Sequence, residues 1–316
     1  MRWPPPTRRR SWPPWSEGAA RRVTVGEAWQ AGREHLTALG VPEAGIAAEV
    51  LLRHALACSR TELYLHWHSP LAPDAWARYE ALLAERARGR PVAYIVGRRE
   101  FMGLEFLVDE RVLIPRPETE LLVEVALAAL AGQPAPVIAD VGTGSGAVAV
   151  SLAVARHDAL VFATDISAAA LEVARANARR HGVEGRVRCL CGDLVAPLAA
   201  VGARLDALVC NPPYVDPATA AALPPEIRDF EPREALVAPE GIGLHRRLAA
   251  EAPRVLAPGG LLAVEVAAGQ AAAVVELLQR EARYEEIATH RDLGGWERVV
   301  SARLQRAASD AAGTSG

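Results

Sequence analysis

The sequence predicts a doubly wound α/β fold, in which a mostly parallel, seven-stranded sheet follows a small helical bundle. Short runs rich in valine, leucine and alanine alternate with helical segments, which is typical of a parallel sheet covered on both faces. Five such runs are Val137–Val141, Leu160–Thr164, Arg186–Leu190, Leu205–Cys210 and Gly260–Val266. Two more, Glu285–His290 and Glu297–Ala302, are joined by Leu293-Gly294-Gly295. They predict an antiparallel pair, so that the last strand runs antiparallel to the sheet.

The segment before the sheet is predicted to be helical. From about Thr24 to Arg90, apolar residues recur at spacings of three and four, with breaks at glycine and proline, so four or five helices are expected. The apolar positions from Phe101 to Ile114 are interrupted by Asp109-Glu110-Arg111, which predicts a β-hairpin that turns there. A helix is expected to follow from Glu118 to Leu130.

Composition limits the possible functions. The chain has 316 residues with 35 basic and 38 acidic side chains, and its formal net charge of -3 argues against a protein that coats nucleic acid. The four cysteines are scattered, so we expect reduced packing residues, no metal site and a cytoplasmic location. No run of about 18 apolar residues occurs, so no membrane span is expected.

A glycine-rich loop follows the first predicted strand. Asp140 and Val141 lead into Gly142, Thr143, Gly144, Ser145 and Gly146. Glycines let the backbone turn sharply and approach a ligand, and the following helix offers free N–H groups. The spacing G-x-G-x-G after an acidic residue favours a loop that wraps adenosine and methionine. A dinucleotide-binding loop, which has the spacing G-x-G-x-x-G, is the alternative.

Acidic residues end the next two predicted strands. Asp165 is expected to bind the ribose hydroxyls of a nucleotide. It could instead cap the following helix, but Ser167 is the better cap. Asp193 is expected to bind the adenine amino group, with Leu194 covering the ring. An ordinary turn capped by Asp193 is the alternative at that position.

Asn211-Pro212-Pro213-Tyr214 follows the fourth predicted strand, at the edge where open α/β sheets bind ligands. The Asn211 side-chain oxygen and a carbonyl of the proline pair could together accept hydrogen bonds from an –NH2 group. They would hold its nitrogen in line with a methyl donor, while Tyr214 packs against the planar group. A tight turn without function is the alternative, because N-P-P-Y is suitable turn chemistry.

From about Ala28 to Leu304 the chain resembles the release factor glutamine N5-methyltransferases. The blocks that carry the resemblance are Pro91–Gly97 with Glu100-Phe101, Leu113–Glu120, Phe230-Glu231-Pro232 with Ala235-Leu236, and Asp292–Arg298. The antiparallel pair that ends the sheet is also typical of methyltransferases. These blocks are more specific than N-P-P-Y, which DNA adenine methyltransferases share.

The resemblance implies transfer of a methyl group from S-adenosylmethionine to the side-chain nitrogen N5 of the glutamine in a Gly-Gly-Gln motif. The expected partner is a peptide-chain release factor, with no requirement for nucleic acid or a membrane, and the chain is expected to be a monomer. The expected ranges are 1–20 for a disordered tail, 21–92 for a helical docking domain, 93–117 for a β-hairpin linker, 118–304 for the methyltransferase domain and 305–316 for a second disordered tail.

The expected site follows from these motifs and the resemblance together. Cofactor contacts are expected from Gly142, Thr143, Gly144, Ser145, Gly146, Asp165, Asp193, Leu194 and Asn211. Catalysis and glutamine binding are expected from Asn211, Pro212, Pro213 and Tyr214, with Phe101 lining the same pocket.

The chain departs from the family pattern at a few positions. Leu194 stands where an aromatic residue is often found, His245 stands where tyrosine is common, and the segment from Glu265 to Gln270 carries extra small residues. We expect these departures at the cofactor rim and the outer helix, away from the N-P-P-Y turn. A nucleic-acid adenine N6-methyltransferase and a non-catalytic cofactor-binding adaptor are the alternative functions.

Overall fold

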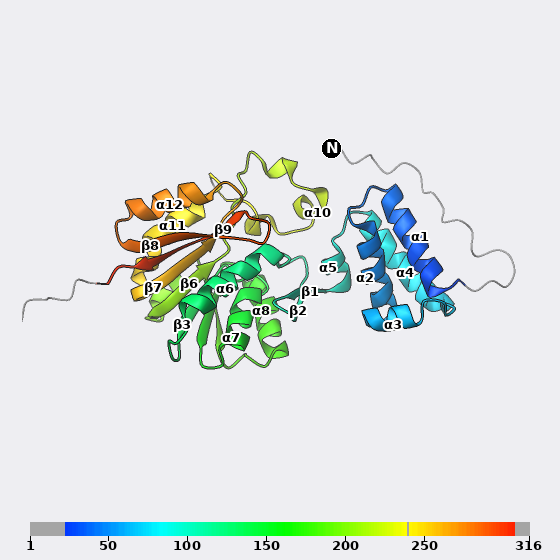
Figure 1. Cartoon of the computed structure of the whole chain (residues 1–316), viewed down its shortest axis with the longest axis horizontal. Coiled ribbons are helices and arrows are strands. Elements are labelled where there is room, and N and C mark those ends of the chain that lie inside the picture. Colours follow the sequence, from blue (N-terminus) through cyan, green and yellow to red (C-terminus); the bar gives the residue numbers. More distant parts are fainter. Residues whose placement is uncertain (1–22, 239, 307–316) are drawn as a thin grey trace, which may run out of the picture. The chain divides into compact units, whose positions relative to one another are not determined.

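The computed structural model describes residues 23–238 and 240–306, and it divides the chain into two compact units, Met1–Arg88 and Gly89–Gly316 (Figure 1). The expected tail at 1–20 lies outside the described residues, as does 307–316 of the second expected tail. None of the helices in the described ranges has both the length and the apolar character needed to cross a membrane.

Four helices are described in the first unit, as predicted. They are α1 (Val25–Ala38), α2 (Ala44–Leu56), α3 (Arg60–Leu65) and α4 (Pro73–Ala87). Capping boxes start two of them, with Thr24 paired to Glu27 at α1 and Ser59 paired to Glu62 at α3. Tyr79 is fully buried, and its hydroxyl donates to the carbonyl of Ala48 at 3.2 Å. This bond ties α4 to α2 in the core of the bundle.

A short helix and a β-hairpin begin the second unit. They are α5 (Val92–Val96), β1 (Arg98–Phe101) and β2 (Leu104–Leu107). The prediction that the hairpin turns at 109–111 was wrong, because the chain turns at Met102 and Gly103. The φ angles of these two residues, 51° and 70°, suit a two-residue hairpin turn. Val112 and Ile114 lie outside any strand and are buried in a small cluster with Tyr94. The 3-10 turn η1 (Pro117–Thr119) and α6 (Glu120–Ala129) follow.

Seven strands form the main sheet, in the order β5-β4-β3-β6-β7-β9-β8. Their bounds are β3 (Val137–Val141), β4 (Leu160–Asp165), β5 (Val187–Cys191), β6 (Leu205–Cys210), β7 (Leu256–Glu265), β8 (Tyr284–Arg291) and β9 (Glu297–Leu304). Strands β3 to β7 are parallel, and β9 is antiparallel to both of its neighbours. The structure therefore confirms the predicted sheet and its antiparallel last strand.

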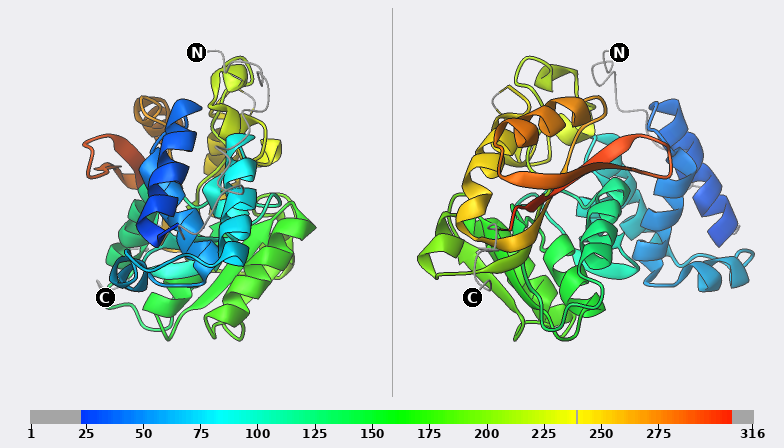
Figure 2. Two further views of the ribbon diagram at one scale, coloured as in Figure 1. Left: turned by 90° about the vertical axis from the view of Figure 1, so that its right-hand side faces the viewer. Right: turned by 60° about the vertical axis from the view of Figure 1, so that its left-hand side comes forward.

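Helices cover both faces of the sheet (Figures 1 and 2). On one face lie α6, α7 (Ala147–Ala155) and α8 (Ala168–Arg180). On the other lie α9 (Ala196–Ala200), α11 (Gly243–Glu251), the 3-10 turn η4 (Ala252–Arg254) and α12 (Ala271–Arg280). Alternate residues of a strand supply the two cores, since Val161 and Ala163 pack on the first face and Phe162 on the second.

A long excursion separates β6 from α11. It contains η2 (Ala220–Ala222), α10 (Pro225–Arg228) and η3 (Arg233–Ala235). Its two ends are joined, because the Val215 N–H donates to the Leu236 carbonyl at 2.9 Å and the Ala238 N–H donates to the Val215 carbonyl at 3.0 Å. The excursion thus leaves the N-P-P-Y turn and returns to it.

Candidate active site

The ends of the parallel strands bring the predicted site residues to one edge of the sheet. The glycine loop follows β3, Asp165 ends β4, Asp193 follows β5 and Asn211 follows β6. β3 and β6 are neighbours, and the following strands are added outward from β3 on one side (β4, β5) and from β6 on the other (β7). A crevice is therefore expected between the carboxyl ends of β3 and β6. The glycine loop and the N-P-P-Y turn flank this point.

The glycines of the loop serve two purposes. Gly142 and Gly144 have φ angles of 73° and 53°, and a Cβ atom at either would meet no atom within 4 Å. These two positions therefore leave room for a ligand to approach the backbone. Gly146, with φ 80°, differs because a Cβ atom there would lie 3.0 Å from the Ala174 side chain. Its role is to let α7 pack closely against α8.

Asp140 hydrogen-bonds both to the glycine loop and to the helix that follows it. Its Oδ2 accepts a hydrogen bond from the Thr143 hydroxyl at 2.6 Å and from the Ala149 N–H at 3.1 Å. The side chain is 2% exposed, and burial raises its pKa to about 7, although both hydrogen bonds favour the charged form. Asp140 thus fixes the loop and the first turn of α7 in one conformation.

Asp165 ends β4 and hydrogen-bonds to the glycine loop, while its expected ribose contact stays a prediction. Oδ2 accepts from the Gly144 N–H at 2.9 Å, and Oδ1 accepts from the Ser167 N–H at 2.8 Å. Ser167 itself caps α8 through the Ala170 N–H at 3.1 Å. Each carboxylate oxygen keeps a further lone pair, so Asp165 can still accept bonds from a nucleoside diol. Burial raises the pKa of Asp165.

Asp193, the expected adenine contact, is paired with an arginine side chain. The Asp193 carboxylate accepts hydrogen bonds from both terminal nitrogens of Arg247, at 2.7 and 3.3 Å. Leu194 has a φ of 45°, and its carbonyl accepts from the Thr164 hydroxyl at 3.4 Å. An adenine contact at Asp193 would have to share the carboxylate with Arg247, so that role stays a prediction.

The N-P-P-Y turn is fixed by contacts from three other segments. Nδ2 of Asn211 donates to Oγ1 of Thr119 at 3.1 Å, which leaves Oδ1 on the opposite side of the amide. The Tyr214 hydroxyl lies 3.5 Å from Oε1 of Glu265, and burial raises its pKa to about 12. The Tyr214 carbonyl accepts from Nε2 of Gln270 at 3.1 Å. Pro212 is buried and Pro213 half-buried.

Glu265 is a buried carboxyl that sequence reasoning did not assign to the site. It is 2% exposed, and burial raises its pKa to about 7, while Thr119 and Tyr214 favour the charged form as hydrogen-bond partners. Its backbone carbonyl lies 2.7 Å from Nε2 of the buried His245. Glu265 and Gln270 therefore both contact Tyr214 of the N-P-P-Y turn, contrary to the expectation that this segment lies away from it. His245 contacts the turn only indirectly, through the backbone of Glu265.

Phe101 lies in the hydrophobic core of the second unit. It is 1% exposed, and its ring packs edge to face with Phe106 at 6.1 Å between centroids. Its expected contact with the substrate stays a prediction, and this packing does not support it.

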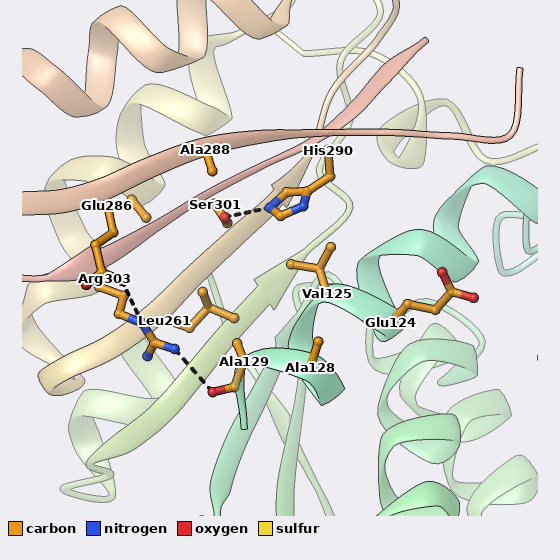
Figure 3. A pocket seen from close by; sticks show the side chains of 11 residues that line it. Glu124, Val125, Ala128, Ala129, Leu261, Glu286, Ala288, His290, Ser301 and Arg303 are labelled. Atoms are coloured by element: carbon orange, nitrogen blue, oxygen red, sulfur yellow. Dashed lines mark hydrogen bonds and ion pairs between the residues drawn. The ribbon is translucent and has the colours of Figure 1, made fainter. Parts of the chain in front are cut away.

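A separate pocket of about 560 Å³ opens between α6 and the β8–β9 pair (Figure 3). His290 and Ser301 meet there, with Nε2 and Oγ 2.8 Å apart. The Arg303 guanidinium is held by the carbonyls of Gly259 and Ala129 at 2.9 and 3.1 Å. His290 is thus paired with Ser301, and Arg303 with backbone carbonyls. The residues that line the pocket are distinct from those of the N-P-P-Y turn and the glycine loop.

Comparisons with known proteins agree with this geometry. Two domain families match the chain, the PrmC N-terminal domain over residues 27–97 and the methyltransferase small domain over residues 117–223. The release factor glutamine methyltransferase of Chlorobaculum tepidum is 47% identical over 245 residues, which cover 75% of this chain and 83% of that protein. The one of Cereibacter sphaeroides is 44% identical over 287 residues, which cover 90% of this chain and 100% of that protein.

A solved structure is also similar. It is the release factor-specific protein-(glutamine-N5) methyltransferase of Alicyclobacillus acidocaldarius, with 32% identity, 63% of this chain and 99% of that chain covered, and a TM-score of 0.40.

The methyltransferase small domain spans both the glycine loop and the N-P-P-Y turn, so the chain is an S-adenosylmethionine-dependent methyltransferase. Relatives that cover most of its length define it more closely. The chain belongs to the release factor glutamine methyltransferase family. The resemblance found in the sequence blocks is thereby confirmed, and so is the methyl donor.

Proposed function

We propose that the enzyme methylates the side-chain nitrogen N5 of a glutamine in the Gly-Gly-Gln motif of a peptide-chain release factor. The supporting observation is the fixed amide of Asn211, which presents Oδ1 as an acceptor beside the cofactor loop. Family membership supports the class of substrate. The motif around the glutamine is inferred from the sequence resemblance.

The chain's own residues account for the chemistry in this proposal. S-adenosylmethionine supplies a methyl group on a positively charged sulfur. An amide nitrogen is a weak nucleophile because its lone pair is delocalised, so the protein must orient it. Asn211 Oδ1 and a carbonyl of Pro212 or Pro213 accept its two N–H groups, and Tyr214 packs against the amide plane. The new nitrogen–carbon bond replaces the sulfur–carbon bond, and one amide proton is released to water.

The cofactor site also fits this donor. Open space above Gly142 and Gly144 admits a ligand close to the backbone, and Asp165 retains acceptor capacity for the ribose. We assign Gly142, Thr143, Gly144, Ser145, Gly146 and Asp165 to the donor, with Asp193, Leu194 and Asn211 as further contacts.

We further propose that residues 21–92 help to dock the release factor, that 93–117 link them to the methyltransferase domain at 118–304, and that the enzyme acts as a cytoplasmic monomer without nucleic acid. The match of residues 27–97 to the PrmC N-terminal domain supports a separate N-terminal module. An adenine N6-methyltransferase would share the N-P-P-Y turn, so the choice of substrate is the point to test.

Substituting Asn211 by Ala tests the function. Loss of a single preorganised contact costs about 10²–10³ in rate, by analogy with an oxyanion site. Methyl transfer to a purified release factor should fall by that factor. Cofactor affinity, measured by calorimetry, should fall much less, because Asn211 is one of several proposed contacts to the donor but the proposed acceptor for the substrate amide. Mapping of the labelled methyl group should find it on the glutamine. Near-normal turnover of the variant, or methylation of nucleic acid instead, would exclude the proposal.

A further inference from the structure

The loop that joins β8 to β9 exposes two large apolar side chains. This loop, residues 292–296, forms the β8–β9 tip. Within it, Leu293 is fully exposed and Trp296 is 59% exposed. Isolated exposed apolar residues are ordinary on a protein surface, whereas neighbouring ones that include tryptophan are typical of protein–protein contacts. A hairpin turn needs neither of these side chains, so their exposure requires another explanation.

Hydrogen bonds around Asp292 hold the β8–β9 tip in one conformation. The Asp292 N–H donates to the Trp296 carbonyl at 2.9 Å, and the Asp292 carbonyl accepts from the Gly295 N–H at 2.9 Å. Oδ1 of Asp292 accepts from the Trp296 N–H at 2.9 Å, and Oδ2 accepts from Nε of Arg298 at 2.8 Å. A surface that is already fixed loses little conformational entropy when a partner binds it. The two apolar side chains are therefore presented on a rigid support.

The β8–β9 tip lies at the edge of the sheet that carries the N-P-P-Y turn. Because β9 is antiparallel to β7, its first residues lie beside the last residues of β7, and Val299 pairs with Glu265. Oε1 of Glu265 lies 3.5 Å from the Tyr214 hydroxyl. Trp296 precedes Val299 by three positions, so their Cα atoms are at most about 11 Å apart. Both views of Figure 2 show the β8–β9 hairpin projecting beyond the parallel strands.

We propose that Leu293 and Trp296 form an apolar contact for the release factor, on the part of its surface that surrounds the methylated glutamine. The inference rests on the proposed function, in which that glutamine binds to Asn211. A glutamine of a folded protein reaches the N-P-P-Y turn only when the surface around it comes to the same edge of the sheet. The β8–β9 tip projects at that edge, so it meets an apolar patch on the incoming protein. This contact adds to the docking proposed for residues 21–92.

Truncation of the two apolar side chains tests the contact in the full-length enzyme with a purified release factor. Leu293→Ser/Trp296→Ser should raise KM for the release factor by about 10-fold or more, the effect of removing interface hot spots. The kcat at saturating release factor and the affinity for S-adenosylmethionine should change little, because neither side chain belongs to the N-P-P-Y turn or the glycine loop. Trp296→Phe keeps an aromatic ring and should hold KM within about threefold.

Val201→Ser is the matched control for loss of an exposed apolar side chain. Val201 is 55% exposed, and it lies between α9 and the start of β6, so it belongs to the opposite edge of the sheet. Its KM for the release factor should equal that of the wild type. All of the replaced side chains are exposed, and urea unfolding should give the same midpoint for every variant.

Failure of this contact and failure of the proposed function give different results. Unchanged KM in the double variant, beside an inactive Asn211→Ala, would overturn the contact and leave the proposed function intact. A fall in kcat with unchanged KM would also overturn it, because the β8–β9 tip would then not act in binding. A wild-type dimer in sedimentation that the double variant loses, with KM unchanged, would assign the tip to a second copy of the chain. Normal turnover of Asn211→Ala would instead remove the proposed function itself.

Discussion

The guanidinium of Arg116 and the carboxyl of Glu231 lie 2.5 Å apart, although they are 115 positions apart in the chain. Glu231 also accepts a bond from the Ile114 N–H at 3.2 Å, and its side chain is 1% exposed. Burial raises the pKa of Glu231, and Arg116 opposes this shift. The pair therefore anchors the excursion after the N-P-P-Y turn to the segment that follows the hairpin.

Arg116→Met should destabilise the enzyme by about 3 kcal/mol, because it leaves a buried carboxylate without its partner. The double variant Arg116→Met/Glu231→Leu should recover part of this loss in urea unfolding. Arg246→Ala, which breaks an exposed ion pair with Glu240, is the control and should leave the midpoint nearly unchanged. Equal stability of Arg116→Met and the wild type would show that the pair does not anchor the excursion.

Asp165→Ala should weaken binding of S-adenosylmethionine by about 1.5–3 kcal/mol, because it removes a charge-assisted contact to the ribose. The variant also loses the bonds to the Gly144 and Ser167 N–H groups, so folding must be checked by circular dichroism. Asp158→Ala, before the opposite end of β4, should leave affinity unchanged. Calorimetry compares the two, and unaltered affinity in folded Asp165→Ala would contradict the ribose assignment.

Removal of the helical unit should separate cofactor binding from substrate docking. A fragment from Gly89 onward keeps the glycine loop and the whole sheet, so it should bind the cofactor normally. Its kcat/KM for an intact release factor should fall, because the docking residues are proposed to lie in the bundle. A fragment from Glu118 is unsuitable, since Phe101 and Phe106 belong to the main core. Full kcat/KM in the Gly89 fragment would refute the docking role.

The stability of the enzyme should depend on the protonation of Glu265. Burial raises its pKa from 4.5 to about 7, so the folded chain binds this proton more tightly than the unfolded chain. Its contribution to the free energy of unfolding is then fully present below about pH 4.5 and declines as the pH rises toward 7. Glu265→Gln should remove that decline, so above pH 7 the free energy of unfolding of the variant should exceed that of the wild type by on the order of 3 kcal/mol. Unfolding by urea at several pH values tests this, with the exposed Glu184→Gln as control.

The parts of the fold that were predictable are those encoded by local patterns. Short runs rich in apolar residues located β3 and β6 at their observed bounds. The hairpin was misplaced because Met102-Gly103 is a weaker turn signal than the charged segment after it. The start of β7 at Leu256 was missed because Pro258, Gly259 and Gly260 suggest a loop, whereas the strand there passes a register shift against β6.

The glycine loop, Asp165 and the N-P-P-Y turn were found from the sequence because each is a compact motif at the end of a strand. Thr119 was missed because its contact with Asn211 spans 92 residues and its position alone suggests a helix cap. Glu265 was noticed only as part of an unusual segment. Its importance depends on burial, which no single-sequence pattern reveals at the end of a strand.

The joined ends of the excursion between Val215 and Ala238 separate its outer part from the turn at Asn211. Because the two ends are bonded to each other and Glu231 is held by Arg116, residues between η2 and α10 can be inserted, deleted or exchanged without moving the turn, as long as Glu231 is kept. The same closure offers protein engineers a site at which foreign recognition loops can be grafted.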